Sequence, residues 1–282
     1  MKPIIVSTDF SPAALNAVNY AADMALALDA TLIILHVYQI PVSMPLSGGM
    51  GGMDTPTMLI PAEELEESAE NRLQELKKNL HHISFSKLVI ETEARLGDVA
   101  DEIGETCKKF DPFVVVMGST GHSAMERVLF GSTTQSVIRE LQWPLLLVPK
   151  GTEYGKGIRK AGLAWDFTKT GGPIPSTEIV SIIKTLKASL HVVHVELDMS
   201  QTTQSVVDNT LQDSLSPVTP SYHHVQDVAL GDGISNFAEK NNFDLLITLP
   251  RKHSFLESIF SKTATKELIQ GSHIPVLCIH AD

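Results

Sequence analysis

The chain is poor in cysteine and in basic charge. Its 282 residues include two cysteines, Cys107 and Cys278, which lie far apart in sequence. A disulfide framework or a zinc site built on cysteine is therefore not expected. Lys and Arg number 22 against 33 Asp and Glu, which gives a net charge of −11. Such an acidic surplus disfavours general binding to nucleic-acid phosphates, so no nucleic-acid partner is expected.

Long apolar runs are missing as well. No run approaches the roughly 20 residues of a membrane-spanning helix, so no membrane partner is expected. A strand-like run at residues 3–6 follows directly on Met1 and Lys2, which leaves no room for a signal peptide. The expected location is therefore the cytoplasm, with Cys107 and Cys278 as buried free thiols.

The histidines form no pattern typical of a metal site. His191 and His194 lie on one expected strand at a spacing that turns them to opposite faces. The adjacent pairs at 81–82 and 223–224 are also poorly placed to share one ion. We therefore expect no metal held by protein side chains.

Apolar strand-like runs alternate with amphipathic helical stretches in the first half of the chain. Almost wholly apolar strands separated by helices are typical of a parallel sheet covered on both faces. A loop rich in glycine and methionine is expected at 41–61. The expected strands lie at 3–8, 31–37, 87–95, 113–117 and 145–148, and the expected helices at 12–28, 62–81, 99–110 and from 132 to about 142.

The second half repeats this order, which indicates a tandem duplication. We therefore predict an α/β fold of two tandem doubly wound domains, each with a five-stranded parallel sheet, at residues 1–150 and 157–282. The matching segments are Asp166-Phe167 with Asp9-Phe10, 189–195 with 31–37 (His194 opposite His36), Gly231-Asp232 with Gly97-Asp98, 244–249 with the fourth strand, and Ile274-Pro275 with Trp143-Pro144.

Glycines mark the passage from the fourth strand into the next helix. Gly118 and Gly121 follow the strand, and Gly131 precedes Ser132 and Thr133 at the expected helix start. Glycine lets a ligand come close to the main chain, and a helix N-terminus offers unpaired N–H groups to an anion. The stretch does not fit the P-loop pattern, because no Gly-Lys-Ser/Thr is present. It nevertheless predicts a phosphate site.

The spacing Gly-x2-Gly-x9-Gly-Ser resembles the nucleotide loop of the universal stress protein family, in its ATP-binding branch. The resemblance implies a Rossmann-like fold of the adenine nucleotide alpha hydrolase type. It implies that Gly118, Gly121, Gly131 and Ser132 hold the ribose and phosphates. It also implies that the carboxylate after the first strand, Asp9, contacts the nucleoside, and that Val37 packs on the adenine.

Further site residues follow from the expected topology. Ligands of doubly wound sheets lie at the carboxyl ends of the strands, where Thr8 and Asp9 meet the end of the fourth strand. Met117 and Val37 are candidates for apolar walls of the base pocket, and Thr133 is a donor beside Ser132. Asp9 also fits a cap for the helix at Pro12, and the two roles are compatible. Mg²⁺ is expected to accompany the triphosphate through phosphates and water.

The second half departs from this loop. Side chains there replace the bare main chain of the first half, so ATP is expected in the N-terminal half alone. The replacements are Leu249 for Gly118, Lys252 for Gly121, Lys262 for Gly131 and Thr263 for Ser132.

Three functions compete. The first is an ATP-binding stress-response or regulatory protein with little or no hydrolysis, for which AMP and ADP are alternative ligands. The second is a slow ATPase or nucleotidyl-transfer enzyme, although Arg127 is the one basic residue in the loop. The third is an interaction scaffold with a non-nucleotide ligand. The family resemblance also implies pairing of the last strands, here 145–148 with 275–279, as an intramolecular pseudo-dimer. Homodimer formation between chains is left open.

Overall fold

A computed structural model describes residues 1–40, 61–84, 87–119, 131–165, 174–196, 209–226, 230–250 and 273–280. The first half contains β1 (Ile4–Ser7), α1 (Pro12–Leu28), β2 (Leu32–Tyr38), α2 (Ala62–Ile83), β3 (Ile90–Leu96), α3 (Val99–Phe110), β4 (Val114–Gly118), α4 (Ser132–Glu140) and β5 (Leu145–Val148). The second half contains β6 (Lys160–Ala164), α5 (Ser176–Leu186), β7 (Ser189–Glu196), α6 (Asn209–Leu215), the short 3-10 helix η1 (Ser216–Val218), β8 (Ser221–Gln226), α7 (Leu230–Lys240), β9 (Leu245–Thr248) and β10 (Val276–Cys278).

The strands form one ten-stranded sheet in the order β3-β2-β1-β4-β5-β10-β9-β6-β7-β8. Strand pairs within each half are parallel, as the apolar runs predicted. The halves join through the antiparallel pair β5–β10, in which Leu146 lies opposite Leu277. The predicted contact between residues 145–148 and 275–279 is therefore present. The α/β fold is confirmed, and the two predicted five-stranded sheets run together as one.

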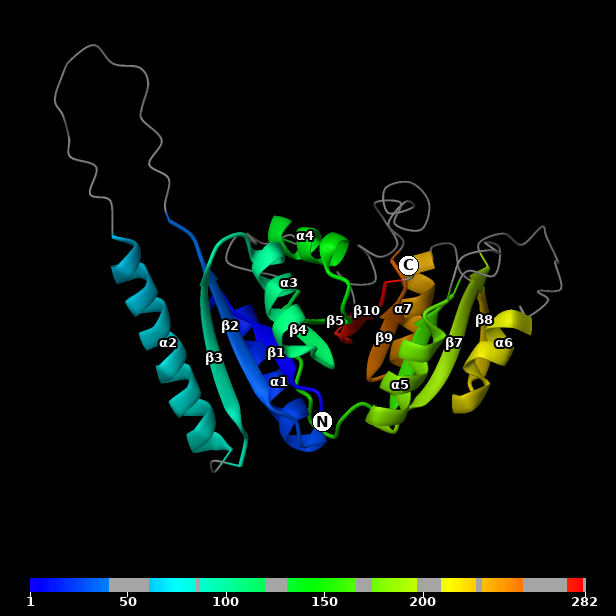
Figure 1. The fold of residues 1–282 in the computed structure, drawn as a ribbon. Helices are drawn as coiled ribbons and strands as arrows, with labels where there is room; N and C mark the ends of the chain where they lie inside the picture. Colours follow the sequence, from blue (N-terminus) through cyan, green and yellow to red (C-terminus); the bar gives the residue numbers. More distant parts are fainter. Residues whose placement is uncertain are drawn as a thin grey trace, which may run out of the picture.

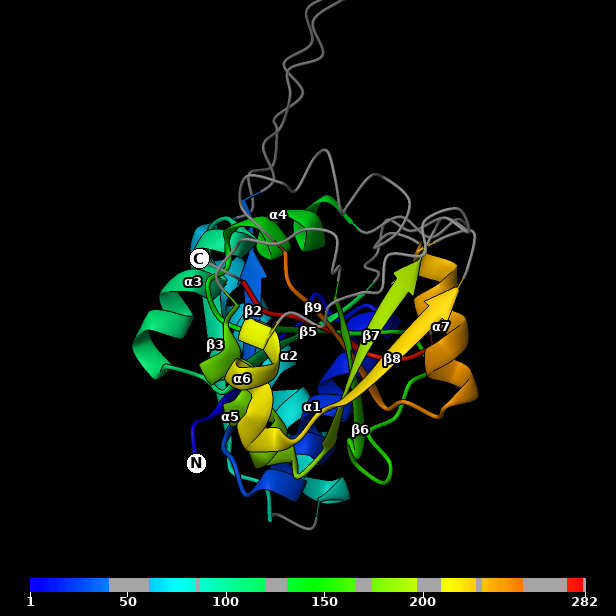
Figure 2. The same cartoon turned by 90° about the vertical axis from the view of Figure 1, so that its right-hand side faces the viewer.

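Helices cover both faces of this sheet (Figures 1 and 2). Alternate strand residues point to opposite faces, so each apolar strand supplies two cores. Ile4 and Val6 of β1 lie in the core beneath α1, whereas Ile5 between them lies in the core beneath α3 and α4. All three are fully buried. Strands buried on both sides need the continuous apolar runs seen in the sequence.

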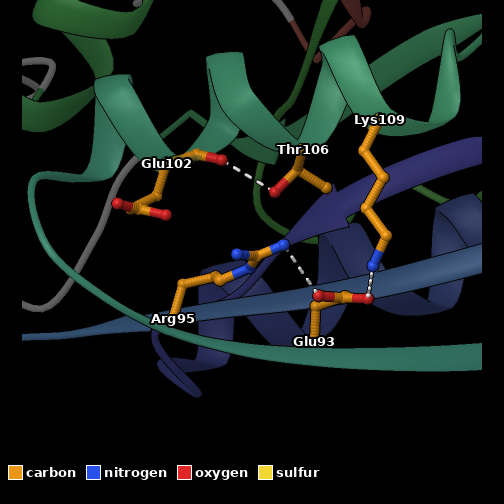
Figure 3. Close-up of polar contacts among 5 residues, drawn as sticks. All are labelled: Glu93, Arg95, Glu102, Thr106 and Lys109. Atoms are coloured by element: carbon orange, nitrogen blue, oxygen red, sulfur yellow. Dashed lines mark hydrogen bonds and ion pairs between the residues drawn. The ribbon is translucent and has the colours of Figure 1, made fainter.

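The edge strand β3 is tied to α3 by charged side chains. Figure 3 shows Glu93 between two cations: its carboxylate accepts from Lys109 of α3 at 2.7 Å and from Arg95 at 3.1 Å. Beside them, the Thr106 hydroxyl donates to the Glu102 carbonyl at 2.7 Å. Charged side chains on an edge strand also oppose pairing with a foreign strand.

Hydrogen bonds hold the segment that connects the two halves, around residues 149–152, to both of them. The side-chain amide of Asn16 on α1 donates to the carbonyls of Pro149 and Thr152, each at 3.1 Å. The Thr152 hydroxyl in turn donates to the His273 carbonyl at 2.9 Å. Hydrogen bonds therefore link the first helix, the connecting segment and the start of the last strand.

Several local predictions can be compared with the structure. The helices at 12–28 and 99–110 and the strand at 145–148 have the predicted bounds. Cys107 and Cys278 are free and buried, as expected, and burial raises the pKa of both thiols to about 12. The expected loop at 41–61 lies, up to residue 60, outside the described residues. No helix in the described ranges is long and apolar enough to span a membrane.

The matched pairs Gly97-Asp98 and Gly231-Asp232 lie at different positions relative to their helices. Asp98 caps α3 by accepting from Ala100 N–H at 2.9 Å, so it precedes that helix. Helix α7 begins at Leu230, and Gly231 and Asp232 therefore lie inside it.

Candidate functional site

The turn after β1 holds itself together by short-range hydrogen bonds. Thr8 is buried, and its hydroxyl accepts from Phe10 N–H at 3.0 Å. The Asp9 carboxylate accepts from Ser11 N–H at 2.9 Å while its residue remains exposed. Phe10 has a φ of 61°, a conformation that non-glycine residues adopt rarely, so these bonds stabilise a tight reversal.

Ser11 rather than Asp9 caps the helix that follows. The Ser11 hydroxyl accepts from Ala14 N–H at 3.2 Å, and Pro12 occupies the first helical position. The prediction of Asp9 as the cap is therefore wrong. Proline at the first helical position places Ser11, the residue before it, at the N-cap. Asp9 braces the turn instead and lies at the carboxyl end of β1, as predicted for a nucleoside contact.

His36 lies on the neighbouring strand β2 and contacts the carboxyl end of β1. Its Nδ1 lies 2.7 Å from the Thr8 carbonyl oxygen. A carbonyl can only accept, so Nδ1 carries the proton. Burial lowers the pKa of His36 below its ordinary value, against the opposing effect of this hydrogen bond, and nearby Arg72 lowers it further. The ring contacts Phe10 at a centroid distance of 4.6 Å, and the Arg72 guanidinium lies 4.0 Å above the Phe10 ring centroid.

The main chain of Val37 extends past the end of β1. Main-chain groups of successive strand residues point to alternate neighbouring strands. Tyr38 accepts from Gly97 N–H on the β3 side, whereas Leu35 accepts from Thr8 N–H on the β1 side. Val37 therefore faces the β1 side, where the next ladder partner would be the Thr8 carbonyl. Among the described residues no main-chain bond joins these two groups. One donor and one acceptor thus face the space beyond β1.

Gly118 at the end of β4 is required by packing against α1. A Cβ there would lie 2.9 Å from the Ala13 carbonyl oxygen and 3.2 Å from Ala14 nitrogen, closer than real side chains approach main chain. Met117 beside it is buried in the same core that Val37 packs against. The bare main chain of Gly118, predicted from the sequence as a ligand contact, thus has a structural cause in the packing of α1 on β4.

The start of α4 is open in a way that the fold does not require. Gly131 is its N-cap, with an ordinary φ of −55° and no side-chain cap. A Cβ at Gly131 would meet no atom of the described residues within 4 Å. Ser132 and Thr133 are exposed, and the first N–H groups of a helix have no partner within the helix. Helix α4 lies at the end of the sheet toward which β2 points (Figures 1 and 2).

Eight of the nine predicted site residues lie in the described part of the chain, where they form two groups. Five lie at the carboxyl ends of β1, β2 and β4, and three begin α4. Gly121 lies outside the described residues, as does Arg127 of the same loop. Sequence reasoning missed His36, Phe10 and Arg72 as parts of the site. The repetition of His36 as His194 was the available signal for the first of these. The predicted residues are Thr8, Asp9, Val37, Met117 and Gly118 in the first group and Gly131, Ser132 and Thr133 in the second.

A groove lies at the other end of the sheet, away from these residues. It is an open groove of about 650 Å³ between the C-terminal ends of α1 and α5 and the connecting segment, and its lining includes Lys156, Lys187 and Asp23. Two helix C-termini carry partial negative charge, which disfavours a phosphate. Burial raises the pKa of Asp23, and nearby Glu153 raises it further. The groove thus sets three cationic side chains, Lys156, Arg159 and Lys187, against two helix C-termini and a carboxylate, whereas the start of α4 offers an anion a helix N-terminus.

Comparison with known proteins places the first half in a family. Residues 1–149 match the model of the universal stress protein family. Universal stress protein MJ0531 of Methanocaldococcus jannaschii is 30% identical over 151 residues, which cover 53% of this chain and 82% of that protein. Universal stress protein G of Salmonella typhimurium is 32% identical over 149 residues, covering 52% of this chain and 98% of that protein.

The fold likeness extends over both halves. The crystal structure of a universal stress protein from Archaeoglobus fulgidus matches 99% of this chain and 98% of its own, with a TM-score of 0.70 and 17% sequence identity. At that identity the likeness concerns the fold alone. It includes the second half, which lies beyond the residues matched by the family model.

Substitution by alanine is expected to change stability differently at Gly118, which ends β4, and at Gly131, which precedes α4. Gly118→Ala places a Cβ against the Ala13 carbonyl and is expected to lower the free energy of unfolding by about 1–3 kcal/mol. Gly131→Ala meets no atom of the described residues and is expected to cost less than about 1 kcal/mol, through a weaker N-cap. Urea unfolding of both variants measures the difference. A Gly118→Ala variant no less stable than Gly131→Ala would contradict the packing assigned to Gly118.

His36 is expected to make stability depend on pH. Its pKa is lower in the folded chain than the ordinary value of about 6.5, so the unfolded chain gains the proton first as pH falls. This contribution to stability is full above the unfolded-state pKa and is lost as pH falls below it. The loss is expected to be under about 1 kcal/mol per pH unit, because the ring is half-exposed.

The matched variant is His36→Asn, whose amide can still donate to the Thr8 carbonyl but does not titrate. Urea unfolding at pH 7.5 and 5.5 is expected to show a larger loss of stability for the parent protein than for the variant. Equal losses would mean that His36 titrates alike in both states.

Proposed function

Because this chain belongs to the universal stress protein family, we propose that its N-terminal half binds ATP and that the protein acts in stress response or regulation. The nucleotide serves as a conformational signal and undergoes little or no hydrolysis. AMP and ADP are the competing adenine nucleotides. The observation that carries the proposal is the start of α4, which has no side-chain cap and no described atom near a Cβ at Gly131. It lies at the end of the sheet toward which β2 points (Figure 2), and β2 carries Val37, whose main chain has no ladder partner on β1 among the described residues.

The base end of the proposed site rests on Val37. Its N–H and C=O form a donor–acceptor pair of the kind that matches a purine edge, where a ring nitrogen accepts beside an amino group that donates. The side chains of Val37 and Met117 belong to one apolar cluster and can support the ring. Asp9 is exposed beside them, where its carboxylate can accept from a ribose hydroxyl.

The phosphate end rests on α4. Its first N–H groups have no side-chain cap and carry the positive end of the helix dipole, so they attract an anion. Ser132 and Thr133 add hydroxyl donors at the exposed surface. In this arrangement Mg²⁺ would be held by phosphate oxygens and water rather than by side chains, as is usual for this ion. The bare Gly131 allows the phosphates to approach the helix closely.

Binding is favoured over hydrolysis by the charges in the described part of the site. Phosphoryl transfer needs a cation at the transferred group and a residue that orients the nucleophile. The three residues that begin α4 carry no charge, and Arg72 stacks on Phe10 at the other end of the site. Single-turnover phosphate release tests this part: no release over many minutes supports a binding protein, whereas stoichiometric release supports a slow ATPase.

The joint between the halves supports an intramolecular pseudo-dimer. The carboxyl end of β4, where Gly118 pairs with Val148 of β5, belongs to the proposed site. Strand β5 pairs in turn with β10 of the second half. Two paired strands thus connect the proposed nucleotide site with the second half, which gives a route by which nucleotide binding can influence that half.

A charged substitution at position 131 provides the sharpest test of the proposed ATP site. Gly131→Asp introduces a favoured N-cap residue, so the fold is expected to keep its stability. The carboxylate would lie beside the triphosphate, and the repulsion is expected to weaken ATP binding at least about tenfold. Gly131→Asn is the matched control, since asparagine is a comparable N-cap without charge. Calorimetric titration of ATP and urea unfolding provide the two readouts.

The expected result for the parent protein is one ATP per chain. The control variant is expected to retain most of the affinity, and the effect of the aspartate is expected to shrink with AMP, which carries less charge. Equal ATP affinity for the Asp and Asn variants would place the phosphates elsewhere.

A further inference from the structure

We propose that His191 and His223 form a pH-sensitive contact between β7 and the edge strand β8. The contact holds β8 while at least one ring is neutral and releases it when both rings are protonated. The two histidines are 32 residues apart in sequence, and the parallel pairing of β7 with β8 brings them together on one face of the sheet. The proposal concerns the outer edge of the second half and does not rest on the proposed function.

A chain of hydrogen bonds fixes which ring nitrogens carry protons. His191 Nδ1 lies 3.0 Å from His223 Nε2, and His191 Nε2 lies 3.1 Å from the Ser189 hydroxyl oxygen. That hydroxyl donates to the Arg159 carbonyl at 3.2 Å, so toward His191 it can only accept. His191 therefore carries its proton on Nε2, and its Nδ1 accepts from His223 Nε2–H. Every bond of this chain is made while both rings are neutral.

The contact between the rings tolerates one added proton but not two. A proton taken up on Nδ1 of His223 leaves its Nε2–H in place, so the bond to His191 persists with a charged donor. The one remaining lone pair of His191 is on Nδ1, which faces His223. When both rings are charged, two N–H groups meet head to head and two positive charges repel each other. The second proton therefore binds only if the rings separate.

Two phenylalanines hold the histidine pair against α7. The ring centroids of His191 and Phe243 lie 5.0 Å apart, and those of His223 and Phe237 also lie 5.0 Å apart. The two phenylalanine rings meet edge-on at 5.8 Å. Phe237 belongs to α7, which packs on both β7 and β8 (Figure 2). Separation of the histidines would therefore disturb the packing of α7 as well as the pairing of β8.

The surroundings of the pair favour its neutral form. Burial lowers the pKa of both histidines below the ordinary value. Positive charge on His223 and on Lys160 of β6 lowers the pKa of His191 further, and His224 has the same effect on the pKa of His223. Within the described ranges no carboxylate forms an ion pair with either ring. A protonated pair thus has no counter-charge there.

The acidic groups on neighbouring elements do not alter this balance. The Asp244 carboxylate accepts from the main-chain N–H of Lys160 at 2.9 Å. On α7, Glu239 and Lys240 are exposed, and in the described part of the chain neither forms an ion pair. These groups are therefore poorly placed to stabilise a charge between the two rings.

The other histidines of these strands lie on the opposite face. His194 Nδ1 lies 3.2 Å from the Trp165 carbonyl oxygen, and its ring packs edge-on against that of His224 at 5.9 Å. Among the described residues no group of three or more His, Cys, Asp or Glu gathers, so the pair lacks the third protein ligand that zinc sites have. A proton rather than a metal ion is therefore the expected ligand of the pair.

The pH range follows from the lowered pKa values. An opened segment binds protons at the ordinary histidine pKa of about 6.5, whereas the closed pair binds them only at lower pH. Closure is therefore fully favoured above about pH 6.5 and weakens as pH falls below it. The two proton-binding steps belong to the pair, because its rings interact directly. Strand β8 ends the strand order of the sheet, so it can leave β7 without breaking other strand pairs.

Hydrogen exchange of the full-length protein, followed by mass spectrometry at pH 7.5 and 5.0, tests the proposal. Each rate is divided by the exchange rate of an unfolded peptide at the same pH. Protection of β8 is expected to fall at least about tenfold at the lower pH, while that of β5 at the centre of the sheet changes little. Unchanged protection of β8, or an equal loss in β5, would refute the proposed local release.

The variant His223→Gln separates titration from packing. Its amide N–H can replace Nε2–H as the donor to His191, and its amide oxygen can accept from a protonated His191. The loss of protection in β8 between the two pH values is expected to be less than about threefold in this variant. His82→Gln removes an exposed histidine of α2 and serves as the matched control, which is expected to behave like the parent. If His223→Gln loses as much protection as the parent, the acid response lies elsewhere.

Imidazole nitrogen NMR shifts of the parent protein give a readout that needs no variant. At pH 7.5 both His191 and His223 are expected to carry their proton on Nε2. As pH falls, the pair is expected to take up one proton while β8 stays protected and the second together with the loss of protection. Rings that titrate independently of each other near pH 6.5, with β8 protected throughout, would overturn the proposal.

Discussion

The hydrogen bond from the His36 ring to the Thr8 carbonyl marks where pairing between β1 and β2 stops. Beyond it β2 continues to Tyr38, while the chain after β1 reverses through Phe10 at positive φ. The reversal brings the first turn of α1 so close to the end of β4 that residue 118 has no room for a Cβ. One strand that ends early therefore accounts for the open main chain of Val37, the position of Asp9 and the need for Gly118.

The same constraint explains how the two halves differ. The second half keeps the histidine–carbonyl contact and the early end of its first strand. Its helix α5 starts later after the strand, and the glycine at the end of β4 is replaced by Leu249 at the end of β9. The repeated part is main-chain geometry, which side-chain substitution leaves intact. The part that diverged is the bare loop on which the proposed phosphate contacts depend.

Sequence reasoning succeeded where local signals were strong. Pro12 after Ser11 and the apolar periodicity gave the bounds of α1, and near-continuous apolar strands predicted a sheet buried on both faces. It failed where the cause lay in tertiary contacts. The close approach of Ala13 to Gly118 depends on how α1 packs on β4, which no spacing in the sequence reveals. Arg72 reaches the site from α2, a helix that is distant in sequence from Phe10, on which it packs.

The central claim is that the N-terminal half alone accommodates a triphosphate, with the base at Val37 and the phosphates at the start of α4. Crystals grown or soaked with excess ATP and magnesium test it most directly. The account predicts one ATP per chain, its base against the main chain of Val37 and its phosphates beside Gly131, Ser132 and Thr133. An empty N-terminal site at saturating ATP, or a triphosphate bound only at the ends of β6 and β9, would contradict it.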